Sequence, residues 1–333
     1  MIRLPIVPVG AAAAIALAAT SACTGSRTPG ARSEDDLIHL RVATAPYLAF
    51  APLYVAQEQG YFADEGLDVE FVHFAGSEIA VPALVAGSID ILPSQASPGL
   101  LNAIGRGAVI RLVGRVHDAT SSDCSPIRIL ARPGLLEEPE VSGHPPVRRV
   151  SLNRQAVMMW LADEAFASVG LNLDSLEIVD IPNAVEADAI ESGAVDAALA
   201  GEPWLSRTVS AGKADPWIAI TDVMPDVEVT LLFYGARLIE RERDAGARFL
   251  RALDSALRML GQGPTSDNVE LLAKVTGEDP AVLRGACWSF EQGDGRVRIE
   301  SVMRFQNWAR RRGLIDRILT GPQLWDPGFS GPR

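Results

Sequence analysis

The stretch that decides the fold is residues 43–67, ATAPYLAFAPLYVAQEQGYFADEGL. It follows a short β-rich run around Val42 and leads into a second run of the same kind, residues 68–72. Between the two runs come a loop rich in proline and aromatic residues and then a helical pattern that ends at glycines. Backbone N–H groups at the start of such a helix point towards a ligand. The stretch therefore predicts a strand–loop–helix–strand unit whose first loop is a place for binding.

Strand and helix patterns alternate along the first third of the chain, as in α/β proteins. β-branched and apolar runs of strand length cover residues 40–44, 68–74, 89–93 and 110–116. Apolar residues at helical spacing lie between them in residues 51–59, 78–86 and 98–106. These alternating segments predict a first lobe made of parallel α/β units.

A second α/β pattern begins at residue 127 and is interrupted by a turn-rich excursion over residues 135–146. Its expected strands are residues 127–131, 149–152, 176–181, 194–200 and 217–221, and its expected helices are residues 156–169, 184–191 and 203–211. After an apolar run at 227–235, helices are expected at residues 240–261, 266–276, 280–287 and 299–312. Two lobes joined by two crossings predict a hinged protein, with residues 127–131 and 229–234 as the hinge. The ligand then lies between the lobes, at the carboxyl ends of the strands.

A second informative stretch is residues 192–204, SGAVDAALAGEPW. With the first stretch, it resembles the SsuA/TauA-type solute-binding proteins of ABC importers, over roughly residues 40–320. That family delivers sulfonates, taurine, nitrate or thiamine-precursor pyrimidines. The resemblance implies a type II periplasmic-binding-protein fold, with two α/β lobes, a hinge and a cleft. We expect lobe 1 to be residues 37–126 and 232–333, and lobe 2 to be residues 127–231.

The first residues are typical of an export signal. Arg3 supplies a positive start, residues 10–19 form a short apolar core, and Thr20-Ser21-Ala22-Cys23 resembles the box after which lipoproteins are cut. Thr20 departs from that box, which usually has an aliphatic residue at this position. The prediction is a signal peptide over residues 1–22, lipidation of Cys23, and a polar tether over residues 23–36 that holds the protein at the outer face of the cell membrane. The alternative is ordinary cleavage that releases a soluble secreted protein.

The composition describes an acidic globular protein. Hydrophobic residues make up 48% of the chain and charged residues 22%, which excludes a disordered chain. A formal net charge of −12 argues against a nucleic-acid partner, because an acidic surface repels phosphates. We expect a monomer with a small-molecule solute and no cofactor.

Three cysteines occur, Cys23, Cys124 and Cys287. If Cys23 carries a lipid, the other two can pair outside the cytoplasm, or they can be small buried apolar side chains. The sequence leaves both alternatives open, because the distance between their Cα atoms decides. No metal site is expected, since neither has a Cys or His neighbour at ligand spacing.

Candidate binding residues in the first lobe follow two expected strands. Pro46, Tyr47 and Phe50 lie in the loop before the first helix, where aromatic rings can hold a small planar or aliphatic ligand. Core packing is the alternative for these rings. Ser94 and Gln95 follow the strand 89–93, at a position where a hydroxyl can either cap the next helix or contact a ligand.

The second lobe supplies candidates at two further strand ends. One group is Asn153, Arg154 and Gln155, where Arg154 either pairs with a carboxylate or sulfonate or is an exposed turn residue. The other is Glu202 and Trp204, in the segment that carries the family resemblance. Glu202 either accepts hydrogen bonds from an amine or caps the following helix. We expect Trp204 to face Tyr47 across the cleft.

The sequence therefore predicts the extracytoplasmic solute-binding component of an ABC importer, with a permease and an ATPase as partners and no catalysis. One alternative is an enzyme on the same fold, of the kind that makes a pyrimidine or a menaquinone precursor. An export signal and the absence of a recognisable nucleophile and base speak against it. Another alternative is a solute receptor that does not transport. The chain has only two lysines, so a planar or mildly cationic nitrogen compound suits the candidate cleft slightly better than an oxyanion.

Overall fold

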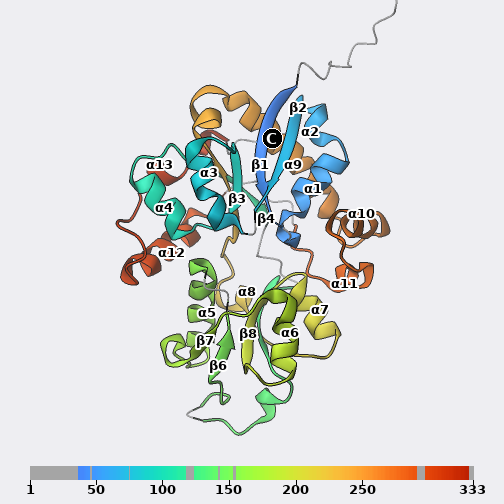
Figure 1. Ribbon diagram of the computed structural model, residues 1–333, viewed down its shortest axis with the longest axis vertical. Coiled ribbons are helices and arrows are strands. Elements are labelled where there is room, and N and C mark those ends of the chain that lie inside the picture. The colour runs from blue at the N-terminus through green and yellow to red at the C-terminus, as the bar shows by residue number, and fades with distance from the viewer. Residues whose placement is uncertain are drawn as a thin grey trace, which may run out of the picture.

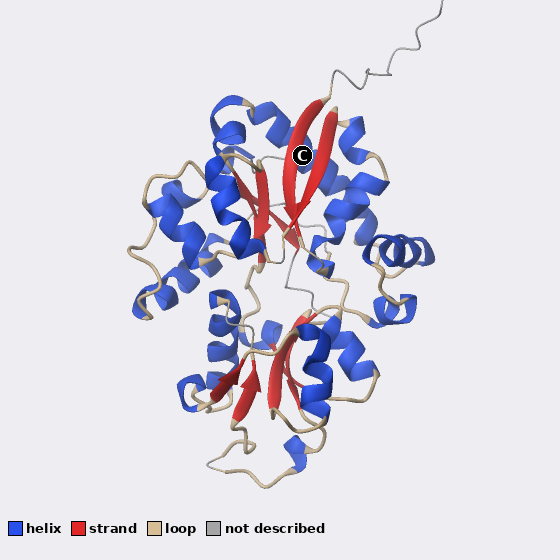
Figure 2. Cartoon of the chain, viewed as in Figure 1, coloured by secondary structure: helices blue, strands red, loops and turns tan. Residues whose placement is uncertain are grey.

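The computed structural model describes residues 37–45, 47–74, 76–117, 124–141, 143–152, 155–290 and 297–329. These residues form two lobes, one above the other in Figure 1, and each lobe is built on a five-stranded sheet. Helices flank both sheets (Figure 2). This is the two-lobed α/β architecture that the alternating pattern predicts.

Lobe 1 contains the sheet with strand order β2-β1-β3-β10-β4. Its strands are β1 (Ile38–Thr44), β2 (Leu67–His73), β3 (Ile91–Ser94), β4 (Arg111–His117) and β10 (Thr230–Tyr234). β1 runs parallel to β2 and β3, whereas β10 is antiparallel to both of its neighbours, β3 and β4. All five residues of β10 are buried, as expected of a strand in the interior of a covered sheet.

The helices of lobe 1 come from both ends of the chain. They are α1 (Ala51–Glu58), α2 (Tyr61–Asp64), α3 (Val81–Ala86), α4 (Pro98–Gly105), α9 (Arg243–Leu260), α10 (Ser266–Thr276), α11 (Pro280–Gly285), α12 (Ile299–Arg311) and α13 (Gly321–Leu324). The long helix α9 has a buried apolar face at helical spacing, which includes Phe249, Leu253 and Leu260. This face packs on α1, α2 and β2, so the C-terminal third of the chain closes the core that the N-terminal third begins.

Lobe 2 contains the sheet with strand order β7-β6-β8-β5-β9. Its strands are β5 (Ile127–Ala131), β6 (Arg149–Ser151), β7 (Glu177–Val179), β8 (Ala197–Gly201) and β9 (Asp215–Ala219), and its helices are α5 (Ala156–Ser168), α6 (Asn183–Glu191), α7 (Trp204–Ser210) and α8 (Ile220–Val223). β6 runs parallel to β7 and β8, and β5 is antiparallel to β8 and β9. Each sheet thus has one antiparallel strand in its interior.

The two antiparallel strands lie at the predicted hinge. β5 and β10 cover residues 127–131 and 230–234, and each lies between two hydrogen-bonded neighbours within its sheet. Flexing at this place stays a prediction. The chain crosses between the lobes just before each of these strands. Thr230 and Leu231, expected in lobe 2, therefore belong to the sheet of lobe 1.

A hydrophobic contact between α12 of lobe 1 and α5 of lobe 2 joins the lobes at one side. The ring centroids of Trp160 and Phe305 lie 5.6 Å apart. The Trp308 Nε1–H donates to the Asp163 carboxylate at 2.7 Å, and Arg312 reaches the same carboxylate at 3.2 Å. One buried cluster therefore continues from the first sheet through α12 into lobe 2.

Among the residues that the structure describes, no helix combines the length and the hydropathy that a membrane crossing needs. The predicted signal peptide, the lipidation at Cys23 and the tether over residues 23–36 lie outside the described residues.

Candidate ligand-binding site between the two lobes

A cavity lies where the two lobes meet. Its empty volume is about 1050 Å³, counting the part open to solvent. Both lobes contribute residues to its wall, from strands, helix starts and the loops between them. The lining residues are Tyr47, Leu48, Ala49, Phe50, Ser94, Gln95, Pro126, Ile127, Gln155, Met158, Asn183, Leu199, Gly201, Glu202, Trp204, Val229, Thr230 and Cys287.

The structure brings most of the predicted site residues to this wall. The seven predicted residues that line it are Tyr47, Phe50, Ser94, Gln95, Gln155, Glu202 and Trp204. The other three, Pro46, Asn153 and Arg154, lie outside the described residues.

The aromatic pair spans the cleft. Tyr47 follows β1 in lobe 1, and Trp204 is the first residue of α7 in lobe 2. Their ring centroids lie 5.6 Å apart, with the planes at 65° in an edge-to-face arrangement. This is the arrangement that the sequence predicts. The ring centroids of Phe50 and Tyr47 lie 6.2 Å apart. Phe50 is buried in the core of lobe 1 and also lines the cavity, so it has both the packing role and the position at the site that were considered for it.

Two buried polar atoms in the wall have no partner among the described residues, Ser94 Oγ and Gln95 Oε1. Ser94 is only 2% exposed. Burying a polar group without a hydrogen bond costs about 1–3 kcal/mol. The cap of the next helix, α4, is instead Ser97, whose Oγ accepts from the Leu100 N–H at 3.3 Å. Ser94 and Gln95 are therefore available to a bound molecule.

Glu202 is engaged with protein donors. Its carboxylate accepts from the Cys287 N–H at 2.9 Å, from the Ser206 hydroxyl at 2.9 Å and from the Ser206 N–H at 3.2 Å. The Ser206 N–H belongs to the first turn of α7. Glu202 therefore makes the contact of a helix cap, which is one of the two roles considered for it. The pKa of the Glu202 carboxyl is raised, because the effect of burial outweighs that of these hydrogen bonds, which lower it.

Several lining residues were not predicted. Asn183 begins α6, directly after the loop that follows β7. Gln155 was predicted because it follows a strand, and the same reasoning could have selected Asn183. Thr230 and Ile127 begin the antiparallel strands β10 and β5. The start of an antiparallel strand lies at the same sheet edge as the ends of its parallel neighbours, and the direction of these strands was not visible in the sequence.

The described wall carries little charge. Within the described part of the lining, Glu202 is the one carboxyl, and no Lys, Arg or His side chain is present. Burial raises the pKa of the Tyr47 hydroxyl, which keeps it protonated. No group of three or more His, Cys, Asp or Glu side chains able to hold a metal occurs among the described residues. This part of the wall suits an uncharged or weakly basic molecule with hydrogen-bonding groups.

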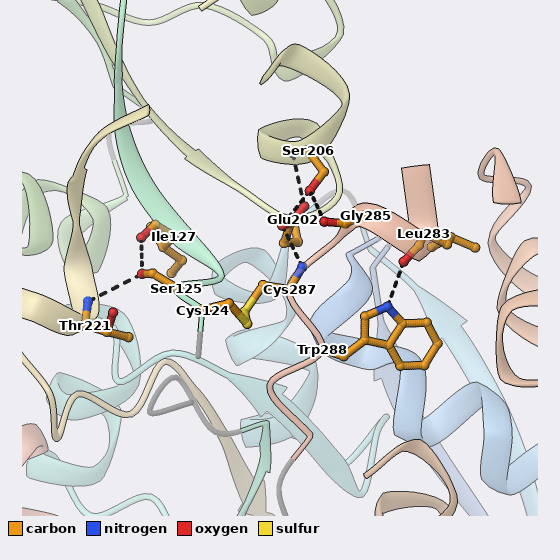
Figure 3. The surroundings of a disulfide bond; sticks show 10 residues. All are labelled: Cys124, Ser125, Ile127, Glu202, Ser206, Thr221, Leu283, Gly285, Cys287 and Trp288. Carbon is orange, nitrogen blue, oxygen red and sulfur yellow. Dashed lines mark hydrogen bonds between the residues drawn. A yellow bond between two sulfur atoms is a disulfide. The ribbon is translucent and has the colours of Figure 1, made fainter. Parts of the chain in front are cut away.

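A disulfide joins Cys124 to Cys287 at one side of the cavity (Figure 3). Their Cα atoms are 5.6 Å apart, although 163 residues separate them in sequence. The structure thereby decides between the two alternatives that the sequence left open. Cys287 is part of the cavity wall, so the bond fixes a lining residue.

Glu186 is a buried acid close to this site in the fold, on α6 three residues after Asn183. The Ser151 hydroxyl, at the end of β6, donates to its carboxyl at 2.6 Å. Burial raises the pKa of Glu186 to about 7. In the pH range between 4.5 and 7 the folded protein therefore holds this proton more tightly than the unfolded chain, so stability falls as pH rises through that range.

We predict that Glu186→Gln flattens this pH dependence. From pH 5 to pH 8 the wild-type free energy of unfolding should fall, relative to the variant, by about 2–3 kcal/mol, because only the wild type must ionise a buried carboxyl. Denaturant unfolding at the two pH values measures the difference, and Glu177→Gln at an exposed position of β7 is the control. Parallel pH profiles for wild type and Glu186→Gln would contradict the assignment.

Comparisons with known proteins agree with this architecture. The family model described as NMT1/THI5 like matches residues 48–266, more than half of the chain. The comparison with curated protein sequences finds no significant match.

Solved structures of low sequence identity share the fold. The ligand-binding component of an ABC-type import system from Staphylococcus aureus, solved with zinc bound, has a TM-score of 0.71 at 15% identity, covering 88% of this chain and 98% of that chain. The alkanesulfonate-binding protein SsuA from Xanthomonas axonopodis pv. citri, bound to MOPS, has a TM-score of 0.67 at 17% identity, covering 87% and 99%. The desulfurization enzyme DSZB has a TM-score of 0.60 at 16% identity, covering 88% and 97%.

The fold is thus that of two-lobed solute-binding proteins, and it is also the fold of an enzyme. The resemblance to SsuA-type proteins agrees with the family match. This chain belongs to the NMT1/THI5-like family.

Proposed function

We propose that this protein is the solute-binding component of an ABC importer, which captures a small organic solute between its lobes and delivers it to a permease. The observation that carries the proposal is the cavity whose wall pairs Tyr47 of lobe 1 with Trp204 of lobe 2. A molecule in this cavity that contacts both rings touches both lobes at once, so it favours the closed arrangement over an open one.

The proposed solute is a sulfonate, a taurine-like compound, or a pyrimidine or other nitrogen compound. The described wall favours the last class. Gln95 Oε1 needs a hydrogen-bond donor, Ser94 Oγ can donate or accept, and two aromatic rings suit a planar molecule. An anionic solute would depend on Arg154 or on helix N-termini for its charge. A thermal-shift screen with sulfonates, amines, pyrimidines and amino acids separates these classes.

A second candidate is an enzyme, because DSZB shares the fold at low identity. The described wall offers a hydroxyl at Ser94, but that hydroxyl has no base as a hydrogen-bond partner among the described residues. Cys287 is held in a disulfide, which leaves no thiolate there. These contacts favour binding over catalysis.

The proposal places the protein outside the cytoplasm, held at the membrane by lipid on Cys23, as a monomer that meets its permease and ATPase partners there. We predict that Cys23→Ser removes the lipid mass and moves the protein from the membrane fraction to the soluble fraction, because no other anchor is proposed. Mass spectrometry and fractionation measure both changes, with Thr24→Ser as the neighbouring control. An unchanged mass and an unchanged membrane fraction for Cys23→Ser would contradict the lipid anchor at Cys23.

We predict that Trp204→Ala weakens binding of the screened solute by roughly tenfold or more, because a large aromatic side chain in the wall of the site is lost. Trp204→Phe, which keeps a ring, should lose less. Isothermal titration measures the affinity, and thermal unfolding checks that each variant is folded. Equal affinities for wild type and Trp204→Ala would exclude Trp204 from the site.

We also predict that the bound solute leaves the protein chemically unaltered, since the proposed role is capture and release. Mass spectrometry of the solute recovered after prolonged incubation tests this. The denatured protein is the control for spontaneous decay. Turnover that requires the folded protein would move it into the enzyme class.

A further inference from the structure

The Cys124–Cys287 disulfide connects the two lobes through a segment that touches both. We call residues 278–290, from the end of α10 through α11 to Phe290, the strap. One end of the disulfide is Cys287 in the strap, and the other is Cys124, three residues before β5 of lobe 2. The bond is therefore a third covalent connection between the lobes, in addition to the two chain crossings.

Cys124 is fixed to lobe 2 by the residues that follow it. The Ser125 hydroxyl donates to the Ile127 carbonyl oxygen at 2.7 Å and accepts from the Thr221 N–H at 3.4 Å (Figure 3). The next carbonyl oxygen, that of Pro126, accepts from the Glu202 N–H at 3.1 Å. These bonds tie the segment to β5, α8 and the end of β8, so Cys124 moves with lobe 2.

The strap is fixed to lobe 1 by apolar packing. Leu283, Ala286 and Phe290 are buried in the core that α1, α9 and α10 share. The Trp288 indole N–H donates to the Leu283 carbonyl oxygen at 2.7 Å, which holds the strap in its folded form. The strap therefore belongs to lobe 1.

Noncovalent bonds from the strap to lobe 2 converge on α7 and on Glu202 just before it. Glu202 accepts from the Cys287 N–H at 2.9 Å, the Ser206 hydroxyl donates to the Gly285 carbonyl oxygen at 3.4 Å, and Arg207 pairs with Glu278. Each such bond is weak by itself, and weaker where it is exposed to solvent. The first residue of α7 is Trp204, so these bonds also set the position of a cavity wall.

We propose that the disulfide keeps the strap docked on α7 when the cavity is empty, so that this side of the cleft stays closed and Trp204 is held in place. A covalent link raises the effective concentration of the strap at α7, which makes weak bonds persist that would otherwise open. A wall that is already in place lowers the conformational cost of binding. The proposal concerns the empty protein and goes beyond solute capture, since it holds whatever the solute is.

Hydrogen exchange of the empty, full-length mature protein tests the proposal. The oxidised wild type is compared with the same protein reduced by a dithiol and with the double variant Cys124→Ser, Cys287→Ser. Amides of the strap and of α7, among them those of residue 287 and Ser206, should exchange roughly tenfold faster once the disulfide is absent. Amides of the interior strands β1 and β8 should keep their protection.

A matched control weakens the contact between α12 and α5, at the other side of the lobes. Asp163→Ala removes the bonds of α5 to Trp308 and Arg312 and leaves the disulfide intact, so exchange in the strap should not change. Equal exchange of the strap and α7 with and without the disulfide would overturn the proposal. A uniformly faster exchange over both lobes would also overturn it, because the disulfide would then stabilise the whole fold. If the double variant does not fold, the reduced wild type supplies the same comparison.

Discussion

Two passages of the chain between the lobes are the constraint on which the rest of the structure depends. Each passage delivers an antiparallel strand into the interior of a sheet, β5 in lobe 2 and β10 in lobe 1. Each of these strands runs opposite to its two hydrogen-bonded neighbours. The starts of β5 and β10 therefore lie at the same edges as the carboxyl ends of β3 and β8, and these edges enclose the cavity.

The chemistry of the cavity follows from which polar groups the protein satisfies itself. Glu202 accepts hydrogen bonds from Cys287 and Ser206, so it stabilises the wall and has little capacity left to accept a hydrogen bond from a ligand. Ser94 and Gln95 each keep a buried oxygen without a described partner. Because an orphaned buried oxygen is costly, a solute that supplies the missing hydrogen bonds gains affinity and selectivity at this point. We therefore expect recognition by neutral hydrogen bonds in a cavity whose wall includes two aromatic rings.

Much of the fold could be predicted from local patterns. The bounds of β5 and α10 agree with the prediction residue for residue, because apolar spacing and helix caps are local signals. Strand direction is not a local signal, so the antiparallel direction of β5 and β10 was not predicted. The wall residues Thr230 and Ile127 were missed for the same reason. The disulfide depends on a distance across 163 residues, which no local pattern contains.

The most direct test of the central claim is small-angle scattering of the purified protein with and without a screened solute. In this account the disulfide keeps one side of the cleft closed in the empty protein. A solute that contacts both Tyr47 and Trp204 closes the remaining opening, so the radius of gyration should become smaller at saturation. The same radius with a saturating bound solute would contradict capture between two moving lobes.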